Sequence, residues 1–160
     1  MTYPVPRMTA AEGDAWTGLI RVCELLPSEL DSQLQRDASM THFEFAVLTF
    51  LRWTPGSTAA MSEIAEATSA TLSRLSHVCT RLQGRGLVER TASPDDRRVT
   101  RVTLTSAGRR ALIHAIPGHI ETARRLVIDA LSAEDLAHLA RITALLGERL
   151  DPEDRFGARR

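Results

Sequence analysis

The segment 84–106, GRGLVERTASPDDRRVTRVTLTS, constrains the fold of this 160-residue chain more than any other stretch. Two runs with β-strand character, Gly86–Arg90 and Val99–Thr105, flank a polar tip at residues 91–96. The tip is rich in Pro, Asp and Ser, which suit tight turns, so the pattern predicts a β-hairpin. Arginines follow the tip at once, which makes this end of the hairpin strongly basic.

Positive charge is concentrated around this hairpin. The whole chain has 20 basic and 20 acidic residues, and every basic residue is an arginine. Residues 71–110 nevertheless contain nine arginines against three acidic residues, a local net charge of +6. Genome composition can explain the use of Arg in place of Lys, but it does not explain the clustering. A localised positive field on a neutral chain is typical of a surface that binds nucleic acid.

Helix-start signals divide most of the remaining chain into helices. Two Thr-x-x-Glu capping boxes, at Thr9 and Thr41, are each followed by apolar residues at helical spacing. Pro27 is expected to kink or restart the first helix, and Pro117 is expected to bend a later one. The expected helices are 9–38, 42–53, 63–68, 71–84, 106–130 and 132–150.

Two of these helices are short neighbours, separated by a tight break near residues 69–70. Two helices joined in this way indicate a helix-turn-helix, and a hairpin directly after them makes it a winged helix-turn-helix. We therefore expect a mainly α fold with a small β-hairpin wing, plus flanking N- and C-terminal helices. The last of these should pack lengthwise on other helices, because it has a series spaced 3, 4, 3, 4: Leu136, Leu139, Thr143, Leu146 and Leu150. The expected buried stripe of the second short helix is Leu72, Leu75, Val78, Cys79 and Leu82.

The polar and basic face of that helix suits the major groove of double-stranded DNA. A helix fits the groove, and Arg74 could form a bidentate bond to guanine. An arginine just beyond a hairpin tip could enter the minor groove, whose negative potential deepens where the groove narrows. The candidate DNA-binding residues are Thr71, Ser73, Arg74, Ser76, His77, Arg81, Asp96, Arg97, Arg98 and Arg101.

Residues 40–110 resemble the MarR family of bacterial transcriptional regulators. Asp96-Arg97-Arg98 followed by Val102–Thr105 is similar to the family's D-x-R…LT wing signature, and GRGLVER is similar to its junction between recognition helix and wing. The resemblance implies one domain that includes two dimerisation segments. The implied boundaries are 1–160 for the MarR-like domain, 9–38 and 106–150 for the dimerisation helices, and 41–105 for the winged helix-turn-helix.

The resemblance also implies how such a protein works. It implies a homodimer with two recognition helices in successive major grooves of a palindromic operator, and Arg98 in the minor groove, braced by Asp96. It implies repression or activation that a bound effector relieves; we expect a repressor and a small aromatic or lipophilic effector. His77 stands where many relatives carry Arg or another larger polar residue, so the operator sequence stays open.

A thiol-based alternative rests on Cys23 in the first helix. One branch of the resembled family senses peroxide through an N-terminal cysteine surrounded by tyrosines, whereas this chain has only Tyr3. A reactive thiol also needs a cationic, partly exposed setting, and Arg21 and Glu24 are ambiguous neighbours. We expect a packed, apolar Cys23, with redox sensing as the alternative, and a Cys79 in the core.

Other classes of function have less support. The chain has no P-loop, G-x-G-x-x-G or G-x-S-x-G sequence, so we expect neither an enzyme nor a cofactor. Its five histidines include no i, i+4 pair, so we expect no metal. No apolar run reaches the roughly 18–20 residues of a membrane span, and two lone cysteines suit a reducing cytoplasm.

A winged helix that binds protein remains an alternative. Trp16, His42 and Phe45 could line an effector pocket or belong to the core, and the effector-binding residues stay unknown.

Overall fold

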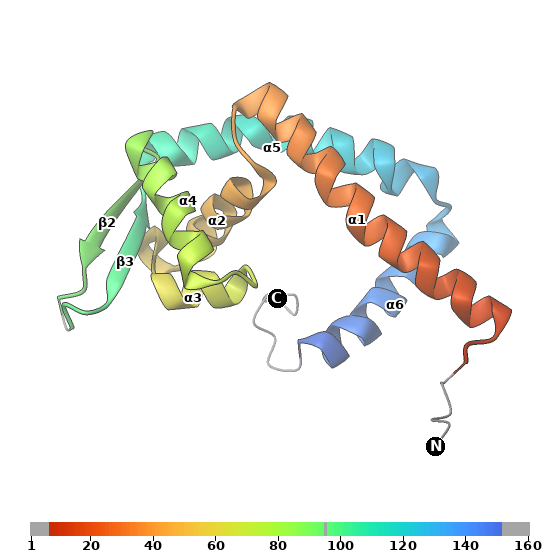
Figure 1. Ribbon diagram of the computed structural model, residues 1–160. Helices are drawn as coiled ribbons and strands as arrows, with labels where there is room; N and C mark the ends of the chain where they lie inside the picture. The colour runs from red at the N-terminus through yellow and green to blue at the C-terminus, as the bar shows by residue number, and fades with distance from the viewer. Residues whose placement is uncertain (1–6, 95, 152–160) are drawn as a thin grey trace, which may run out of the picture.

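Helices carry most of the chain, and a small sheet lies at one end of them (Figure 1). The computed structural model describes residues 7–94 and 96–151. Tyr3, Asp95 and both ends of the expected 1–160 domain lie outside the described residues. In chain order the elements are α1 (Ala10–Ala38), α2 (His42–Trp53), the 3-10 helix η1 (Pro55–Ser57), β1 (Thr58–Ala60), α3 (Met61–Ala67), α4 (Leu72–Gly84), β2 (Val88–Ala92), β3 (Thr100–Leu104), α5 (Ser106–Leu126), the 3-10 helix η2 (Ile128–Ala130) and α6 (Ala133–Leu150).

Helix α5 connects the two ends of the molecule (Figure 1). At one end lie α2, α3, α4 and the sheet, which together form the winged-helix region. At the other end α1 runs away from that region, and α6 follows α5 after a sharp turn. The mainly α fold with a small wing, expected from the sequence, is confirmed.

Five of the described α-helices, α1, α2, α4, α5 and α6, start where the sequence predicts them. Thr9 and Thr41 both form complete capping boxes, in which Glu12 and Glu44 accept the backbone N–H of the cap residue at 2.7 and 2.8 Å. Each box satisfies N–H groups that a helix start would otherwise leave free. The first helix continues through Pro27 as one element.

The sheet differs from the expected two-stranded hairpin because it has a third strand. Its strand order is β1-β3-β2, and both pairs are antiparallel. The third strand, β1, has only three residues, and Ala59 lies opposite Val102 in the register. A three-residue strand is too short to show the alternation that marks strands in a sequence. Its pairing with β3 attaches the wing to the start of α3.

Three local expectations were wrong. Ala60 rather than Ser62 precedes α3, because the Glu63 carboxylate accepts the backbone N–H of Ala60 at 2.6 Å. Leu72, the first residue of α4, is 56% exposed rather than part of the buried stripe. The helix expected to reach residue 130 ends at Leu126 and gives way to η2.

The main hydrophobic core lies in the winged-helix region and under the start of α5. Gly108 shows how closely α5 approaches the wing: a Cβ atom there would lie 2.0 Å from the carbonyl oxygen of Leu87. No side chain larger than hydrogen fits, so the start of α5 is held directly against the chain that enters β2. Fully buried members of the core include Leu34, Val47, Leu48, Leu51, Ile64, Leu75, Cys79, Leu82, Val102 and Leu112.

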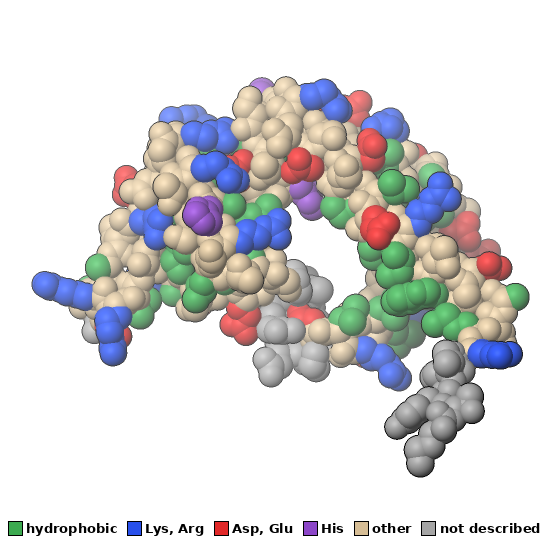
Figure 2. Space-filling view, viewed as in Figure 1, with side chains coloured by type: hydrophobic (Ala, Val, Ile, Leu, Met, Phe, Trp, Pro, Cys, Tyr) green, Lys and Arg blue, Asp and Glu red, His purple; other side chains and the backbone are tan. Residues whose placement is uncertain are grey.

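The other end of the molecule leaves apolar side chains exposed. Helix α6 has no buried residue, so the leucine seam expected to pack lengthwise on other helices remains open in the single chain. Hydrophobic side chains gather on this end of the molecule (Figure 2). The exposed large apolar residues of α1 and α6 include Trp16, Leu19, Ile20, Val22, Leu25, Leu139, Ile142, Leu145, Leu146 and Leu150.

Candidate nucleic-acid interface

Helix α4 presents the polar face that the sequence predicts. The Thr71 hydroxyl accepts the backbone N–H of Arg74 at 3.2 Å and caps the helix start. Leu75, Val78, Cys79 and Leu82 are buried against the core. Burial of this stripe turns Ser73, Arg74, His77 and Arg81 outward, and Ser76 is half-buried.

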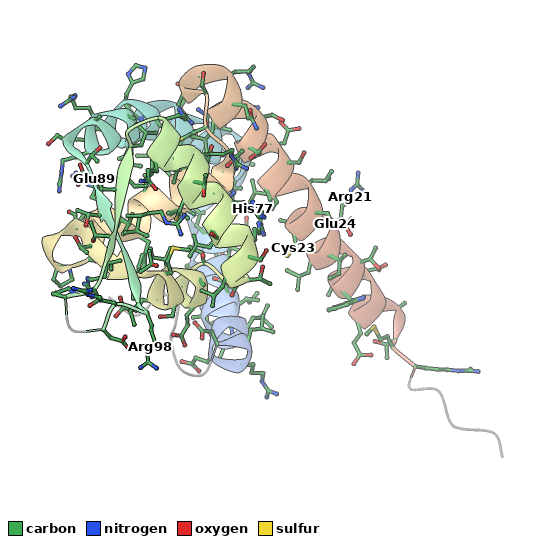
Figure 3. The ribbon with its side chains drawn as sticks, turned by 60° about the vertical axis from the view of Figure 1, so that its left-hand side comes forward. Arg21, Cys23, Glu24, His77, Glu89 and Arg98 are labelled. Atoms are coloured by element: carbon green, nitrogen blue, oxygen red, sulfur yellow. The ribbon has the colours of Figure 1, made fainter. Side chains whose placement is uncertain are left out.

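The tip of the wing holds a preorganised arginine. Arg98 donates from Nε and Nη2 to the carboxylate of Asp96, at 3.1 Å to Oδ1 and 3.0 Å to Oδ2, and its backbone N–H also donates to Oδ1. These bonds, first from the side chain and then from the backbone, lower the pKa of Asp96. The Arg98 side chain is 91% exposed and projects from the wing (Figure 3). An exposed ion pair adds little stability, so its main physical effect is to orient the guanidinium.

The other two candidate arginines of the wing lie on different parts of it. Arg97 is exposed in the tip. Arg101 is half-buried in β3, where it lies opposite Thr91 of β2 and Ala60 of β1. The structure therefore gives Arg97 the freer guanidinium of the two.

Sequence reasoning missed a contact that holds Arg74. Its guanidinium carbon lies 4.2 Å from the centroid of the Phe43 ring in α2. A cation over an aromatic face is attracted by the ring, so Arg74 is drawn toward α2 in this conformation. A lone Phe near a helix start gave no signal of this contact, because apolar residues at such positions are usually core.

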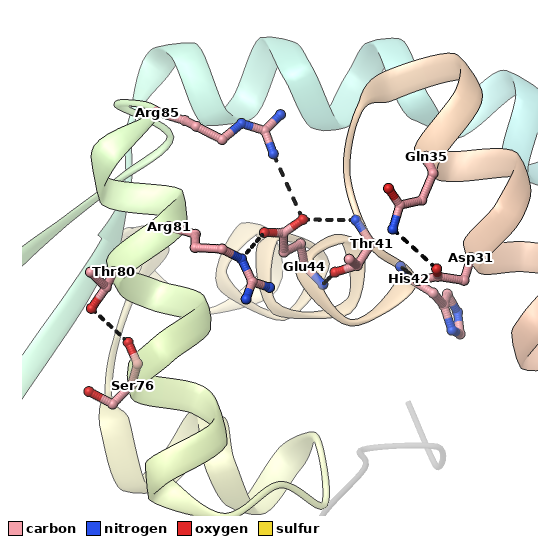
Figure 4. A network of polar contacts seen from close by, with 9 residues as sticks. All are labelled: Asp31, Gln35, Thr41, His42, Glu44, Ser76, Thr80, Arg81 and Arg85. Carbon is pink, nitrogen blue, oxygen red and sulfur yellow. Dashed lines mark hydrogen bonds and ion pairs between the residues drawn. The ribbon is translucent and has the colours of Figure 1, made fainter.

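The buried carboxylate of Glu44 is the second missed feature. Its side chain is 5% exposed, and it accepts Nε of Arg81 at 3.2 Å; Nη1 of Arg85 lies 3.8 Å away (Figure 4). Arg81, one of the candidate DNA-binding residues, therefore has its Nε bonded to α2, while its side chain is 55% exposed. Glu44 was recognised in the sequence only as a capping residue.

A cavity of about 1200 Å³ lies between α1, α2 and α4. The α4 residues Arg74, His77 and Arg81 line it together with aromatic residues of α2. Of the three residues weighed as pocket or core, His42 and Phe45 line the cavity, whereas Trp16 is 53% exposed on α1 and does neither. The aromatic residues of its wall are His42, Phe43, Phe45, Phe50, Trp53 and His77.

Two histidines meet beside this cavity. The rings of His42 in α2 and His119 in α5 stack with centroids 5.8 Å apart. The ring centroids of Phe45 and His119 are 4.4 Å apart. Burial lowers the pKa of both imidazoles; the neighbouring His42 lowers that of His119 further, while Asp31 partly opposes the shift at His42. The pair connects the winged-helix region to the long connecting helix.

The two cysteines have opposite surroundings. Cys79 is buried, as expected, and burial raises the pKa of its thiol. Cys23 is exposed in the single chain, so the expectation of a packed Cys23 was wrong for the monomer. Residues 14–25 of α1 are all exposed among the residues that the structure describes, so the thiol has no core to pack into. Arg21 leaves α1 on the side away from the thiol (Figure 3), which gives the thiol no adjacent cation from that residue.

Within residues 7–94 and 96–151, no group of three His, Cys, Asp or Glu side chains could hold a metal ion. None of the helices in the same part of the chain is long and apolar enough to cross a membrane.

Comparisons with known proteins identify the class of this fold and surface. The profile of the MarR family matches residues 39–99. Sco3205, a MarR family transcriptional regulator from Streptomyces coelicolor solved in complex with DNA, is 37% identical, with 95% of this chain and 96% of that chain covered and a TM-score of 0.86. AbsC, a MarR family regulator from the same organism, is 33% identical, with 91% and 98% covered and a TM-score of 0.83.

Comparison with curated protein sequences gave no match. The identity and coverage of the two solved regulators are sufficient for assignment, and the chain belongs to the MarR family of transcriptional regulators. This family consists of regulators and not of enzymes, in agreement with the sequence-based expectation.

Proposed function

We propose that this protein is a transcriptional repressor that binds a palindromic DNA operator as a homodimer. The observation that carries the proposal is the exposed guanidinium of Arg98, held at the wing tip by Asp96. A guanidinium fixed beyond a hairpin can enter a narrow minor groove, where the negative potential is greatest. A solved relative, Sco3205, is in complex with DNA, which supports the same partner here. The proposal includes a cytoplasmic location, where a bacterial DNA-binding regulator meets its operator.

The proposed DNA surface combines the wing with α4. The first half of α4 reads base edges in the major groove, and the wing arginines bind phosphate and the minor groove. Arg81 stands apart from this set, because Glu44 accepts its Nε. The proposed contacts other than Arg81 are Thr71, Ser73, Arg74, Ser76, His77, Arg97, Arg98 and Arg101, with Asp96 as the brace of Arg98.

The open apolar faces of α1 and α6 support the homodimer. A contiguous apolar surface of this kind on a soluble protein usually marks an interface. A second copy would cover it with identical helices around a two-fold axis, and the same axis would place two recognition helices on two half-sites about 10 base pairs apart. The palindrome follows from this symmetry.

The cavity between α1, α2 and α4 is the proposed effector site. Its aromatic wall favours a small aromatic or lipophilic molecule. Arg74 and His77 belong both to this wall and to the proposed DNA surface. A ligand that contacts them from the cavity would change how they face the DNA, which gives a physical route from effector binding to relief of repression.

The central test is Arg98→Ala in a gel-shift assay with a duplex selected by the wild-type protein from random sequence. Wild-type binding should weaken steeply as salt rises, since phosphate contacts release counterions. The variant should lose operator binding while its circular dichroism and sedimentation match the wild type. Unchanged binding by the variant would remove Arg98 from the interface, and a wild-type protein with no salt-dependent DNA binding would favour a protein-interaction module.

A further inference from the structure

Glu44 is the most enclosed carboxylate at the contact between α2 and the recognition helix. A carboxylate with a side chain only 5% exposed must be paired, because an unpaired buried charge is strongly destabilising. Its oxygens have three donors: the backbone N–H of Thr41 at 2.8 Å and Arg81 Nε at 3.2 Å, with Arg85 Nη1 at 3.8 Å. Thr41 is the N-cap residue of α2, Arg81 lies in the last turn of α4, and Arg85, which forms an ion pair, is the residue that directly follows α4.

The two arginines lie four residues apart, Arg81 in the last turn of α4 and Arg85 at its C-cap, so both side chains reach the same carboxylate from the C-terminal end of α4. A single carboxylate that pairs with both restrains the rotation of α4 about its own axis and its separation from α2 (Figure 4). An α-helix is stiff over this length, so a rotation at Arg81 also moves the DNA-facing residues near Thr71.

The start of α2 is itself held by α1. The backbone N–H of His42 donates to Oδ1 of Asp31 at 2.8 Å, next to the capping box of Thr41 and Glu44. Contacts therefore run from α1 through the first turn of α2 to the second half of α4. This chain of contacts places α4 relative to the long helices.

We propose that Glu44 is a positioning residue for DNA recognition, which sets the orientation of α4 through Arg81 and Arg85 without touching DNA. This inference rests on the proposed function, and it assigns Arg81 to the same task instead of a phosphate contact. The direction of the expected change in DNA affinity distinguishes positioning by Glu44 from simple charge repulsion between the protein and DNA. Removal of a negative charge from a DNA-binding protein should strengthen binding to a polyanion, whereas loss of the Glu44 charge should weaken it.

The test compares Glu44→Gln with Glu121→Gln, which removes an exposed acidic charge from α5. Glutamine retains an oxygen that can cap the Thr41 N–H but lacks the charge that binds both arginines. Glu44→Gln should raise the operator Kd about 2- to 30-fold, the range of coupling through a second residue. Glu121→Gln should leave the Kd equal or slightly lower. Equal or tighter binding by Glu44→Gln would overturn the proposal.

A double-mutant cycle with Arg81→Gln distinguishes positioning from direct contact. If Arg81 acts through Glu44, the loss of affinity in the double variant should be smaller than the sum of the two single losses, because the contact between Arg81 and Glu44 is then removed only once; Glu44→Gln also removes the Arg85 pair. The slope of log affinity against log salt should also be unchanged in all three variants. Additive losses, or a slope reduced by about one in Arg81→Gln, would mark Arg81 as a phosphate contact and overturn the proposal.

Amide hydrogen exchange supplies a measurement that needs no DNA. Exchange in the second half of α4 should be faster in Glu44→Gln than in Glu121→Gln, and equal rates would contradict the proposal. If Glu44→Gln does not fold, Arg81→Gln carries the same exchange and salt-slope tests, since its side chain is 55% exposed. Failure of the wild-type protein to bind DNA would instead refute the proposed function.

Discussion

The winged-helix region buries its apolar side chains within one chain, whereas the α1 and α6 end leaves its own exposed. Leu75 and Leu82 of α4 have no exposed surface, while Leu145 of α6 is 54% exposed and Leu150 is 77% exposed. Both helices are amphipathic, so the difference lies in what surrounds them. In α4 the partners are other elements of the same chain, and we propose that the partner of α6 is a second copy.

Two arginine side chains of the winged-helix region are held in different ways. Arg98 is held by Asp96, two residues away in the sequence, whereas Arg81 is held by Glu44, 37 residues away. The first pair forms wherever the wing tip forms. The second pair forms only when α2 and α4 have packed, so it reports the tertiary arrangement.

The largest predicted effect concerns the α1 and α6 end, and it follows from making the exposed apolar face of α6 polar. The double variant Leu139→Glu with Leu146→Glu should be a monomer and should bind the operator about 100- to 10,000-fold more weakly. In the dimer, binding of one recognition helix holds the second close to its own half-site, and a monomer lacks this high effective concentration. Sedimentation and gel-shift assays measure both effects. Arg141→Glu on the same helix is the matched control and should remain dimeric. A double variant that stays dimeric would show that α6 is not at the interface.

The hydrophobic core of the winged-helix region gives the second largest predicted effect. Leu82→Ala should lower the free energy of unfolding by about 2–5 kcal/mol, since it leaves a cavity in a close-packed core. Leu72→Ala, the same substitution at an exposed position of the same helix, should cost far less. Urea denaturation at one fixed protein concentration measures both. Equal losses would mean that α4 does not pack in the way its buried stripe indicates.

The smallest predicted effect lies where the two regions meet, at the His42 and His119 pair. Burial lowers the pKa of each imidazole below its usual value of 6.5, so the unfolded chain binds more protons than the folded chain in this range. Stability should therefore be complete above that pH and should fall as the pH drops through the lowered values.

Thermal unfolding from about pH 7.5 to about pH 5 measures this dependence. His119→Gln should flatten it, because it removes one of the two half-buried imidazoles; His138→Gln, a substitution of an exposed histidine in α6, is the matched control. A profile for His119→Gln that matches the wild type would show that the pair does not contribute to the pH dependence.

Much of the fold could be predicted because its signals are local. The capping threonines and serine lie three residues from the groups that they satisfy, so the start of α1, α2, α4, α5 and α6 is visible in the sequence. The buried stripe of α4 follows from helical periodicity, except at Leu72, where the helix has only begun. The brace between Asp96 and Arg98 is equally local.

The errors arose where a local signal was absent or ambiguous. The strand β1 has three residues and forms only because β3 lies beside it. Cys23 has apolar neighbours in the sequence, but those neighbours face outward together and leave the thiol exposed. An apolar stripe indicates that a helix face is to be covered, and it does not say whether the same chain covers it.

The sequence by itself determined the order of helices, the wing, the basic surface and membership in a family of regulators, because each depends on residues close together in the chain. Tertiary structure decided which distant groups meet: Glu44 with Arg81, Phe43 with Arg74, and His42 with His119. These contacts depend on the distance and rotation between packed helices. Those quantities come from the fit of the whole core, which no short stretch of sequence contains.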